Sequence, residues 1–167
     1  MTPRPARRRR TAERLLIASL LGVTLIASAC DSASDTTVSP EAYIADLEAI
    51  CEATTNDLDA LPDPPEQISV TEFAVDAASL LSSEAEQARQ LAVPDELADE
   101  HRAFVRNTDD QATTWRAIAD SASGAANEDG DGTTSDLVEL TTRVGELTLG
   151  RDDLVVEMGA DGCRRAS

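Results

Sequence analysis

The sequence predicts an all-α protein whose exported part folds as an antiparallel, up-down-up-down four-helix bundle. Apolar residues recur at three- and four-residue spacing in four segments, which prolines or polar loops separate. Alanine is abundant and the chain has only four aromatic residues, which suits closely packed helices better than sheets. Four helices of more than twenty residues each, joined by short connections, favour antiparallel neighbours.

The first 29 residues predict an export signal. Residues 1–14 are basic, and thirteen mostly apolar residues follow from Leu15 to Ala27. This apolar stretch is shorter than the ~20 residues that a membrane-spanning helix needs. The small residues before Cys30 resemble a bacterial lipobox, so we expect removal of residues 1–29 and acylation of Cys30 by palmitate-type chains. Cleavage after Ala29 with release of the chain, and an uncleaved anchor, are the alternatives.

A polar tether is expected over residues 30–38, followed by the bundle domain over residues 39–163 and a tail over residues 164–167. Ser39 and Pro40 are typical of a helix N-cap and of the first helical position. The inward stripe of this first helix is Tyr43, Leu47, Ile50, Cys51, Thr54, Leu58 and Leu61. The prolines that begin at Pro62 end it.

The second helix is expected to begin with a capping box formed by Ser69 and Glu72, and Pro94 interrupts the pattern. A third helix starts near Pro94 and runs to about Ala122. The inward residues of these two helices are Phe73, Ala77, Leu80, Leu81, Ala85, Ala88 and Leu91, then Leu97, His101, Phe104, Val105, Ala112, Trp115 and Ile118. A small, polar loop over residues 121–135 follows.

The fourth helix is expected to end at Gly159, and its inward residues are Leu137, Leu140, Val144, Leu147, Leu154 and Met158. An up-down topology returns its end to the start of the first helix, where Cys51 lies. Lipidation of Cys30 would leave an even pair of cysteines in an exported protein. A Cys51–Cys163 disulfide is therefore predicted, and two independent buried thiols are the alternative.

Several short motifs carry a resemblance to a known group of proteins. They are Ala49-Ile50-Cys51, Leu58 with Leu61-Pro62-Asp63-Pro64-Pro65, Pro94-Asp95-Glu96-Leu97, His101-Arg102-Ala103-Phe104 and Gly159-Ala160-Asp161-Gly162-Cys163. The chain resembles uncharacterised, alanine-rich helical lipoproteins of G+C-rich Gram-positive bacteria, over about residues 40–163. This resemblance implies a helical fold and the terminal disulfide, and it implies no activity.

The charge distribution excludes one class of partner. The formal charge of −18 averages a leader of +5 and a remainder of −23, in which eight arginines face 31 acidic residues. Nucleic-acid binding needs clustered basic residues that neutralise phosphates, so no nucleic-acid partner is expected. No catalytic motif is present, and the chain is predicted not to be an enzyme.

Two residues on the inward stripes are candidate ligand-binding groups. His101 is the only histidine. A histidine on an inward stripe is more often packed in the core than bound to a metal ion. A haem held by His101 and Met158 is a further alternative. Arg151 interrupts the stripe of the fourth helix, so it must pair with an acid or extend outward. A more specific form of this hypothesis places Arg151 in a buried polar network near His101.

The loop before the fourth helix contains a candidate calcium site. Asn127, Asp129 and Asp131 fall at positions 1, 3 and 5 of an EF-hand-like loop, and Gly132 falls at position 6. Val138 stands at position 12, where a calcium loop has a bidentate glutamate. A solvated linker is the competing interpretation, and no other cofactor is expected.

The sequence thus favours a non-enzymatic, lipid-anchored helical module on the outer face of the cytoplasmic membrane. It would have an interaction or structural role in the cell envelope, with an unknown envelope protein as partner. The alternative is a lipoprotein that binds a small ligand in the bundle core or a divalent cation in the 127–135 loop.

Overall fold

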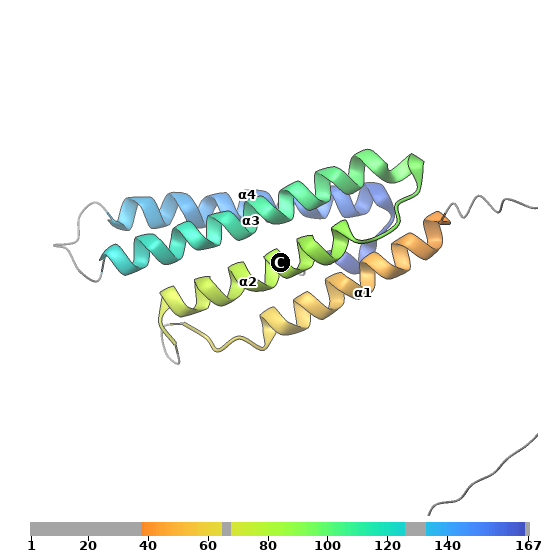
Figure 1. Cartoon of the computed structure of the whole chain (residues 1–167). Coiled ribbons are helices and arrows are strands. Elements are labelled where there is room, and N and C mark those ends of the chain that lie inside the picture. The colour runs from red at the N-terminus through yellow and green to blue at the C-terminus, as the bar shows by residue number, and fades with distance from the viewer. Residues whose placement is uncertain (1–37, 65–67, 126–132, 166–167) are drawn as a thin grey trace, which may run out of the picture. The chain divides into compact units, whose positions relative to one another are not determined.

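The computed structural model describes residues 38–64, 68–125 and 133–165, which contain helices and no strand (Figure 1). In chain order the elements are α1 (Pro40–Asp59), α2 (Val70–Arg89), η1 (Asp95–Leu97), α3 (Ala98–Ala125), α4 (Thr133–Met158) and η2 (Asp161–Cys163). The expected all-α class is confirmed. None of the helices described here has the length and hydrophobicity needed to cross a membrane. The signal peptide, Cys30 and most of the tether lie outside the described residues.

Local capping explains where the first two long helices begin. The Ser39 hydroxyl accepts a hydrogen bond from the Ala42 N–H at 3.2 Å, and Pro40 is the first residue of α1. At α2, Ser69 Oγ accepts from the Glu72 N–H at 3.1 Å, and Glu72 Oε2 accepts from the Ser69 N–H at 3.0 Å. Both predicted helix starts are confirmed, and the second is a complete capping box.

The expectation of matched helices longer than twenty residues is wrong. The helices α1 and α2 have 20 residues each, whereas α3 has 28 and α4 has 26. Proline limits the shorter pair, because residues that precede a proline disfavour the helical conformation and Pro62 and Pro94 follow these two helices. The third helical segment begins as η1 and becomes α-helical only at Ala98.

The helices pack mainly with their neighbours in the chain. Contacts are most extensive between α2 and α3 and between α3 and α4, while α1 meets α2 and η2 (Figure 1). No broad contact joins α1 to α4 among the described residues. The larger buried cluster comprises Tyr43, Leu47, Cys51, Ala88, Phe104, Val105, Val155, Met158, Ala160 and Cys163. A smaller one comprises Ala74, Ile118 and Ala119, with Trp115, Leu137, Leu140 and Val144 half-buried against it.

The segment after α4 folds back onto α1. Gly159 has a φ of 77°, a left-handed conformation that glycine adopts without strain, and the Ala160 N–H donates to the Val155 carbonyl at 2.8 Å. The Gly162 N–H then donates to Glu48 Oε1 at 2.8 Å. Cys51 and Cys163 form a disulfide with a Cα–Cα distance of 5.0 Å. Both the predicted helix end at Gly159 and the predicted disulfide are confirmed.

Candidate functional site

Arg151 lies at the centre of the molecule and contacts all four long helices or their extensions. Its side chain is completely buried. Nη1 donates to the Cys163 carbonyl at 2.7 Å, and Nη2 lies 2.5 Å from Glu84 Oε1 and 3.5 Å from Cys51 Sγ. The guanidinium carbon lies 5.1 Å from the centroid of the Phe104 ring, in a cation–π contact. Arg151 therefore joins α1, α2, α3 and the tail to α4.

Glu84 on α2 receives a second arginine from the tail. Arg165 Nη2 donates to Glu84 Oε2 at 2.8 Å, so each oxygen of this buried carboxylate accepts from a different guanidinium. Arg165 Nη1 also donates to Gln111 Oε1 on α3 at 3.1 Å, and its backbone N–H donates to Asp152 Oδ1 at 3.2 Å. The tail that the sequence separates from the bundle domain thus contributes a side chain to the core.

This group, Glu84 with Arg151 and Arg165, is a buried ion cluster with two cations and one internal anion. Burial and the neighbouring Arg151 cation lower the pKa of Arg165 to about 10, so its guanidinium stays charged at neutral pH. Within the described residues, the Nε atoms of Arg151 and Arg165 are buried without a hydrogen-bond partner. Both terminal nitrogens of Arg151, in contrast, donate to protein groups. The cluster therefore has the chemistry of a structural crosslink.

His101 belongs to a different buried group. Its Nδ1 lies 3.0 Å from the Tyr43 hydroxyl, which also lies 3.7 Å from Met158 Sδ. Burial raises the pKa of Tyr43 to about 12, so the phenol stays protonated. The Tyr43 hydroxyl thus contacts both side chains of the His101–Met158 haem alternative. The contacts of His101 and those of Arg151 involve separate residues, so the two candidate ligand-binding groups do not form one site.

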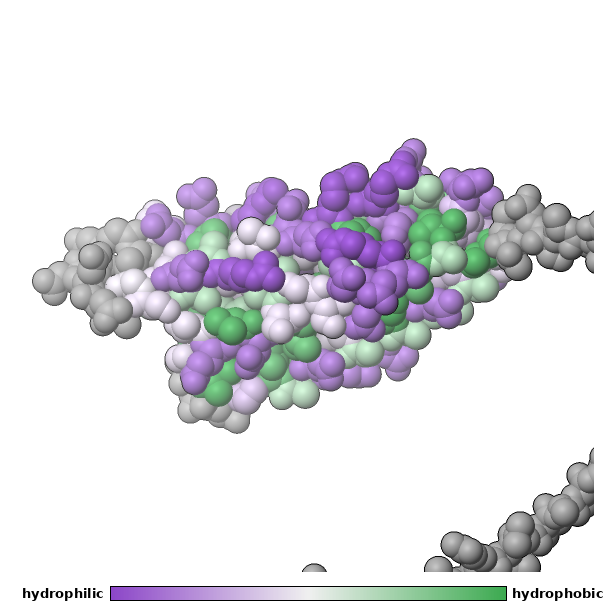
Figure 2. Space-filling view, in the orientation of Figure 1, coloured by the Kyte–Doolittle hydropathy of each residue, from purple (hydrophilic) through white to green (hydrophobic). Residues whose placement is uncertain are grey.

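A surface groove lies on the other side of His101. Its lining residues are Arg89 from the end of α2 and His101, Arg102, Val105, Arg106 and Asp109 from α3, and its volume is about 350 Å³. Figure 2 shows strongly hydrophilic residues gathered over the first half of α3 and the adjoining end of α2. The sequence indicates His101 as a candidate but misses the arginines beside it. The available signal was the i, i+4 spacing of Arg102 and Arg106 next to His101.

The single histidine is expected to titrate below its ordinary pKa of 6.5. Burial is the main cause of the lowered pKa, and the nearby Arg102 cation adds to it. NMR of the imidazole over a pH series measures the midpoint. Arg102→Gln should move it part of the way back, because burial remains.

Protein stability should follow the same pH window. The unfolded chain binds a proton near pH 6.5 and the folded chain binds it only at lower pH, so stability falls as pH drops from about 6.5 through the folded pKa. Above that window His101 is neutral in both states and contributes nothing. His101→Gln should remove this part of the pH dependence. A wild-type midpoint at or above 6.5 would contradict the burial argument.

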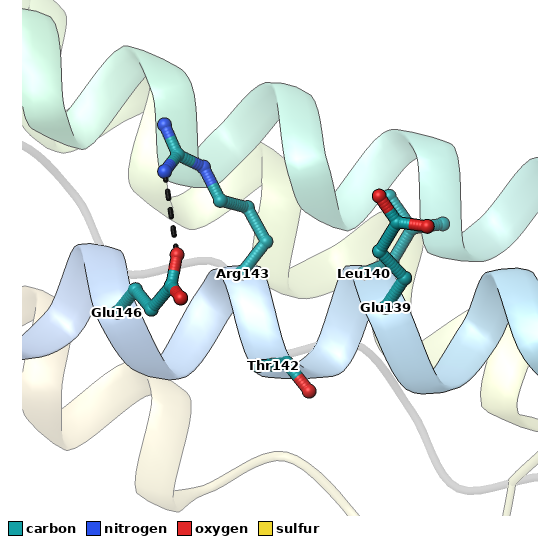
Figure 3. Close-up of a pocket in the computed structure, with 5 residues that line it drawn as sticks. All are labelled: Glu139, Leu140, Thr142, Arg143 and Glu146. Carbon is teal, nitrogen blue, oxygen red and sulfur yellow. Dashed lines mark hydrogen bonds and ion pairs between the residues drawn. The ribbon is translucent and has the colours of Figure 1, made fainter.

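A further pocket lies on the surface of α4. Glu139, Leu140, Thr142, Arg143 and Glu146 line it, and its volume is about 580 Å³. Figure 3 shows Arg143 and Glu146 turned to the same side of α4, where they form an ion pair at 3.4 Å, while Thr142 points the other way. All the lining residues come from one helix, so this pocket is a shallow surface hollow and gathers no catalytic set.

The candidate calcium ligands Asn127, Asp129 and Asp131 lie outside the described residues. Where the chain is described, no group of three or more histidine, cysteine, aspartate or glutamate side chains is arranged to hold a metal ion. The calcium site stays a sequence prediction.

The fold and its buried cluster define the chain as an all-helical protein with a disulfide from its first long helix to the segment after its last. No family model matches the chain, and neither curated proteins nor solved structures show significant similarity to it. The resemblance to helical lipoproteins stays a prediction from the motifs quoted above.

Proposed function

We propose that the chain is a non-enzymatic, lipid-anchored interaction module of the cell envelope, held by acylated Cys30 on the outer face of the cytoplasmic membrane. The partner would present a basic amphipathic helix to the outer face of α4. One observation carries this proposal: three large apolar side chains are exposed in line along α4. Val138 is 62% exposed, Leu149 is 64% exposed and Val156 is 50% exposed.

These side chains share one face of the helix. Their separations of 11 and 7 residues place them within about 20° of one another around the axis. Gly145 falls on the same line, and a Cβ there would meet no atom within 4 Å. Single exposed apolar residues are common on proteins. A row of them on one helix face gives a partner helix apolar anchors spaced along its length.

Charge complementarity favours the basic partner. Exposed acidic residues lie along one side of the row, namely Glu139, Glu146, Asp153 and Glu157, with the exposed Arg143 beyond them. The chain after the leader has a formal charge of −23, which opposes pairing of this face with a second copy. A helix with an apolar stripe and basic flanks would cover the row and neutralise its border.

We also propose that the four helices run up, down, up and down. The packing of α1 with α2, α2 with α3 and α3 with α4 supports this order. The disulfide and the Arg151 cluster then connect the first helix to the last, where direct packing of α1 against α4 is slight. This arrangement leaves the outer face of α4 free for a partner.

The anchor and the docking face can be tested together in cells. A clickable palmitate analogue should label the wild type and not Cys30→Ala. A photo-crosslinking residue at position 149 should capture a defined envelope protein, through a segment that mass spectrometry identifies as basic and amphipathic. Leu149→Glu combined with Val156→Glu should abolish this capture at a crosslinker placed at 142, because it removes apolar contact and buries two carboxylates against the apolar stripe of the partner.

Val75 on α2 supplies the matched control, since it is also a large exposed apolar residue at 52% exposure. A crosslinker at position 75 should not capture the same protein, and Val75→Glu should leave capture intact. Equal palmitate labelling of wild type and Cys30→Ala would overturn the anchor. Capture of a second copy of the chain, or equal capture from positions 75 and 149, would overturn the docking face.

A further inference from the structure

The groove beside His101 concentrates positive charge on an acidic protein. Arg89, Arg102 and Arg106 are three of the eight arginines that follow the leader, and all three line this one groove. The lining adds one acid, Asp109, and one apolar side chain, Val105. The lining residues thus sum to a formal charge of +2, and two acids outside the lining, Glu86 and Asp99, pair with Arg89 and Arg102.

The arrangement of these arginines works against helix stability. Arg102 and Arg106 are one turn apart on α3, and like charges at that spacing repel. Arg102 also lowers the pKa of the adjacent His101, which opposes a further cation there. Neither helix formation nor solubility requires an arginine at both position 102 and position 106 of so acidic a chain. An anion bound between them would relieve the repulsion.

The existing ion pairs leave these arginines available. Arg102 pairs with Asp99, and Arg89 pairs with Asp109 and, at 3.3 Å, with Glu86. Every one of these contacts lies at the exposed surface, where ion pairs contribute ~0–1 kcal/mol and exchange readily with other anions. Arg106 is exposed and makes no ion pair with another residue in the described ranges.

His101 lines the groove, and its lowered pKa keeps the imidazole neutral at pH 7. The Tyr43 hydroxyl lies 3.0 Å from His101 Nδ1 and 3.7 Å from Met158 Sδ. Where this hydroxyl donates to Nδ1, the imidazole carries its proton on Nε2, which has no hydrogen bond to any residue in the described ranges. That tautomer can donate to a ligand in the groove.

We infer that this groove binds a small organic anion through a phosphate or carboxylate group. Guanidinium groups match the paired oxygens of both anions, and Arg102 and Arg106 would hold the oxyanion while His101 Nε2 donates to it. Val105 offers an apolar contact for the organic part of the ligand. The volume of about 350 Å³ is at the small end of ligand sites and limits the ligand to a few functional groups.

The net negative charge of the domain does not prevent this binding. Charges at the surface are screened over about 8 Å at physiological ionic strength. The groove residues act within hydrogen-bond distance of the ligand, where this screening weakens their attraction least. The inference is independent of the α4 docking face and of the lipid anchor.

Calorimetric titration of the full-length protein in neutral detergent tests the groove, with phenyl phosphate and benzoate as probes at constant ionic strength. Saturable binding with a dissociation constant of about 1 mM or tighter is expected for at least one probe. Arg106→Gln should weaken it about tenfold, because it removes one charge-assisted contact. Arg102→Gln combined with Arg106→Gln should abolish it, and the NMR signal of His101 Nε2 should shift on binding in the wild type and not in this double variant.

Arg143→Gln is the matched control, since Arg143 is also exposed and pairs with a carboxylate one turn away. It should bind as the wild type does. Flotation with vesicles of phosphatidic acid in phosphatidylcholine distinguishes the source of the anion. Vesicle association that Arg106→Gln reduces assigns a lipid headgroup, and probe binding with equal association of wild type and Arg106→Gln assigns a soluble anion. Absence of binding in both assays, or equal loss in Arg143→Gln and Arg106→Gln, would overturn the inference.

Discussion

Replacement of Glu84 by glutamine is expected to lower the free energy of unfolding by about 3–5 kcal/mol. Glu84 is completely buried, and its two oxygens accept hydrogen bonds from Arg151 and Arg165. Glutamine keeps the size of the side chain but removes the negative charge, and its amide group presents donors to a guanidinium that also donates. Two buried cations would then remain without their shared anion. Chemical denaturation at neutral pH measures the loss.

Glu86→Gln is the control on the same helix. Glu86 is exposed and forms surface contacts, an ion pair with Arg89 and a hydrogen bond from Gln90 Nε2, so a change within about 0.5 kcal/mol is expected. A second variant separates charge from packing: Glu84→Leu with Arg151→Met and Arg165→Met replaces the whole cluster by apolar groups. It should lose less stability than Glu84→Gln, because no unpaired charge is left. A loss below about 1 kcal/mol for Glu84→Gln would show that solvent reaches the cluster.

The helices could be predicted well because their ends depend on local chemistry. Ser39 with Pro40 and the Ser69–Glu72 box satisfy orphan N–H groups within a few residues, and Gly159 supplies the left-handed stop. The helices α1 and α2 are shorter than expected, whereas α3 and α4 extend into the loop expected over residues 121–135. Tertiary packing decides the last turns of a helix, and neighbouring sequence does not report it.

The buried ion cluster could be predicted only in part. Arg151 stands out because it interrupts an apolar stripe, and pairing with an acid follows from the cost of a buried charge. The choice of Glu84 among 31 acids was open. A usable signal existed: Glu84 lies in the same helical register as Leu81 and Ala88, both of which are buried. Arg165 had no such signal, because it follows the last helix and its position depends on the fold of the tail.

Removal of the disulfide is the second change expected to have a large effect. The Cys51→Ala/Cys163→Ala variant should lose about 4–5 kcal/mol of unfolding free energy, because the bond closes a loop with a sequence separation of 112. Reduction of the wild type at the same denaturant concentrations should give a similar loss without any change of side chain. Val75→Ala, which removes an exposed side chain, should change stability by no more than about 0.5 kcal/mol.

The disulfide and the ion cluster should be energetically coupled, because both hold the tail. Cys163 is bonded to α1 and its carbonyl accepts from Arg151, while Arg165 two residues later reaches Glu84. Without the disulfide, the tail is held by Arg165, by the Arg151 hydrogen bond to the Cys163 carbonyl and by the Gly162 hydrogen bond to Glu48, and its opening withdraws one cation from Glu84. A double-mutant cycle with Arg165→Met should therefore give an interaction energy of about 0.5–3 kcal/mol.

Hydrogen exchange distinguishes the origin of the loss. If loss of the disulfide affects only the unfolded chain, the Gly162 and Cys163 amides stay protected from exchange until the whole protein unfolds. If the tail is released locally, these two amides exchange first. Additive losses together with intact tail protection would mean that the crosslink acts only on the unfolded state and that Arg165 holds the tail unaided.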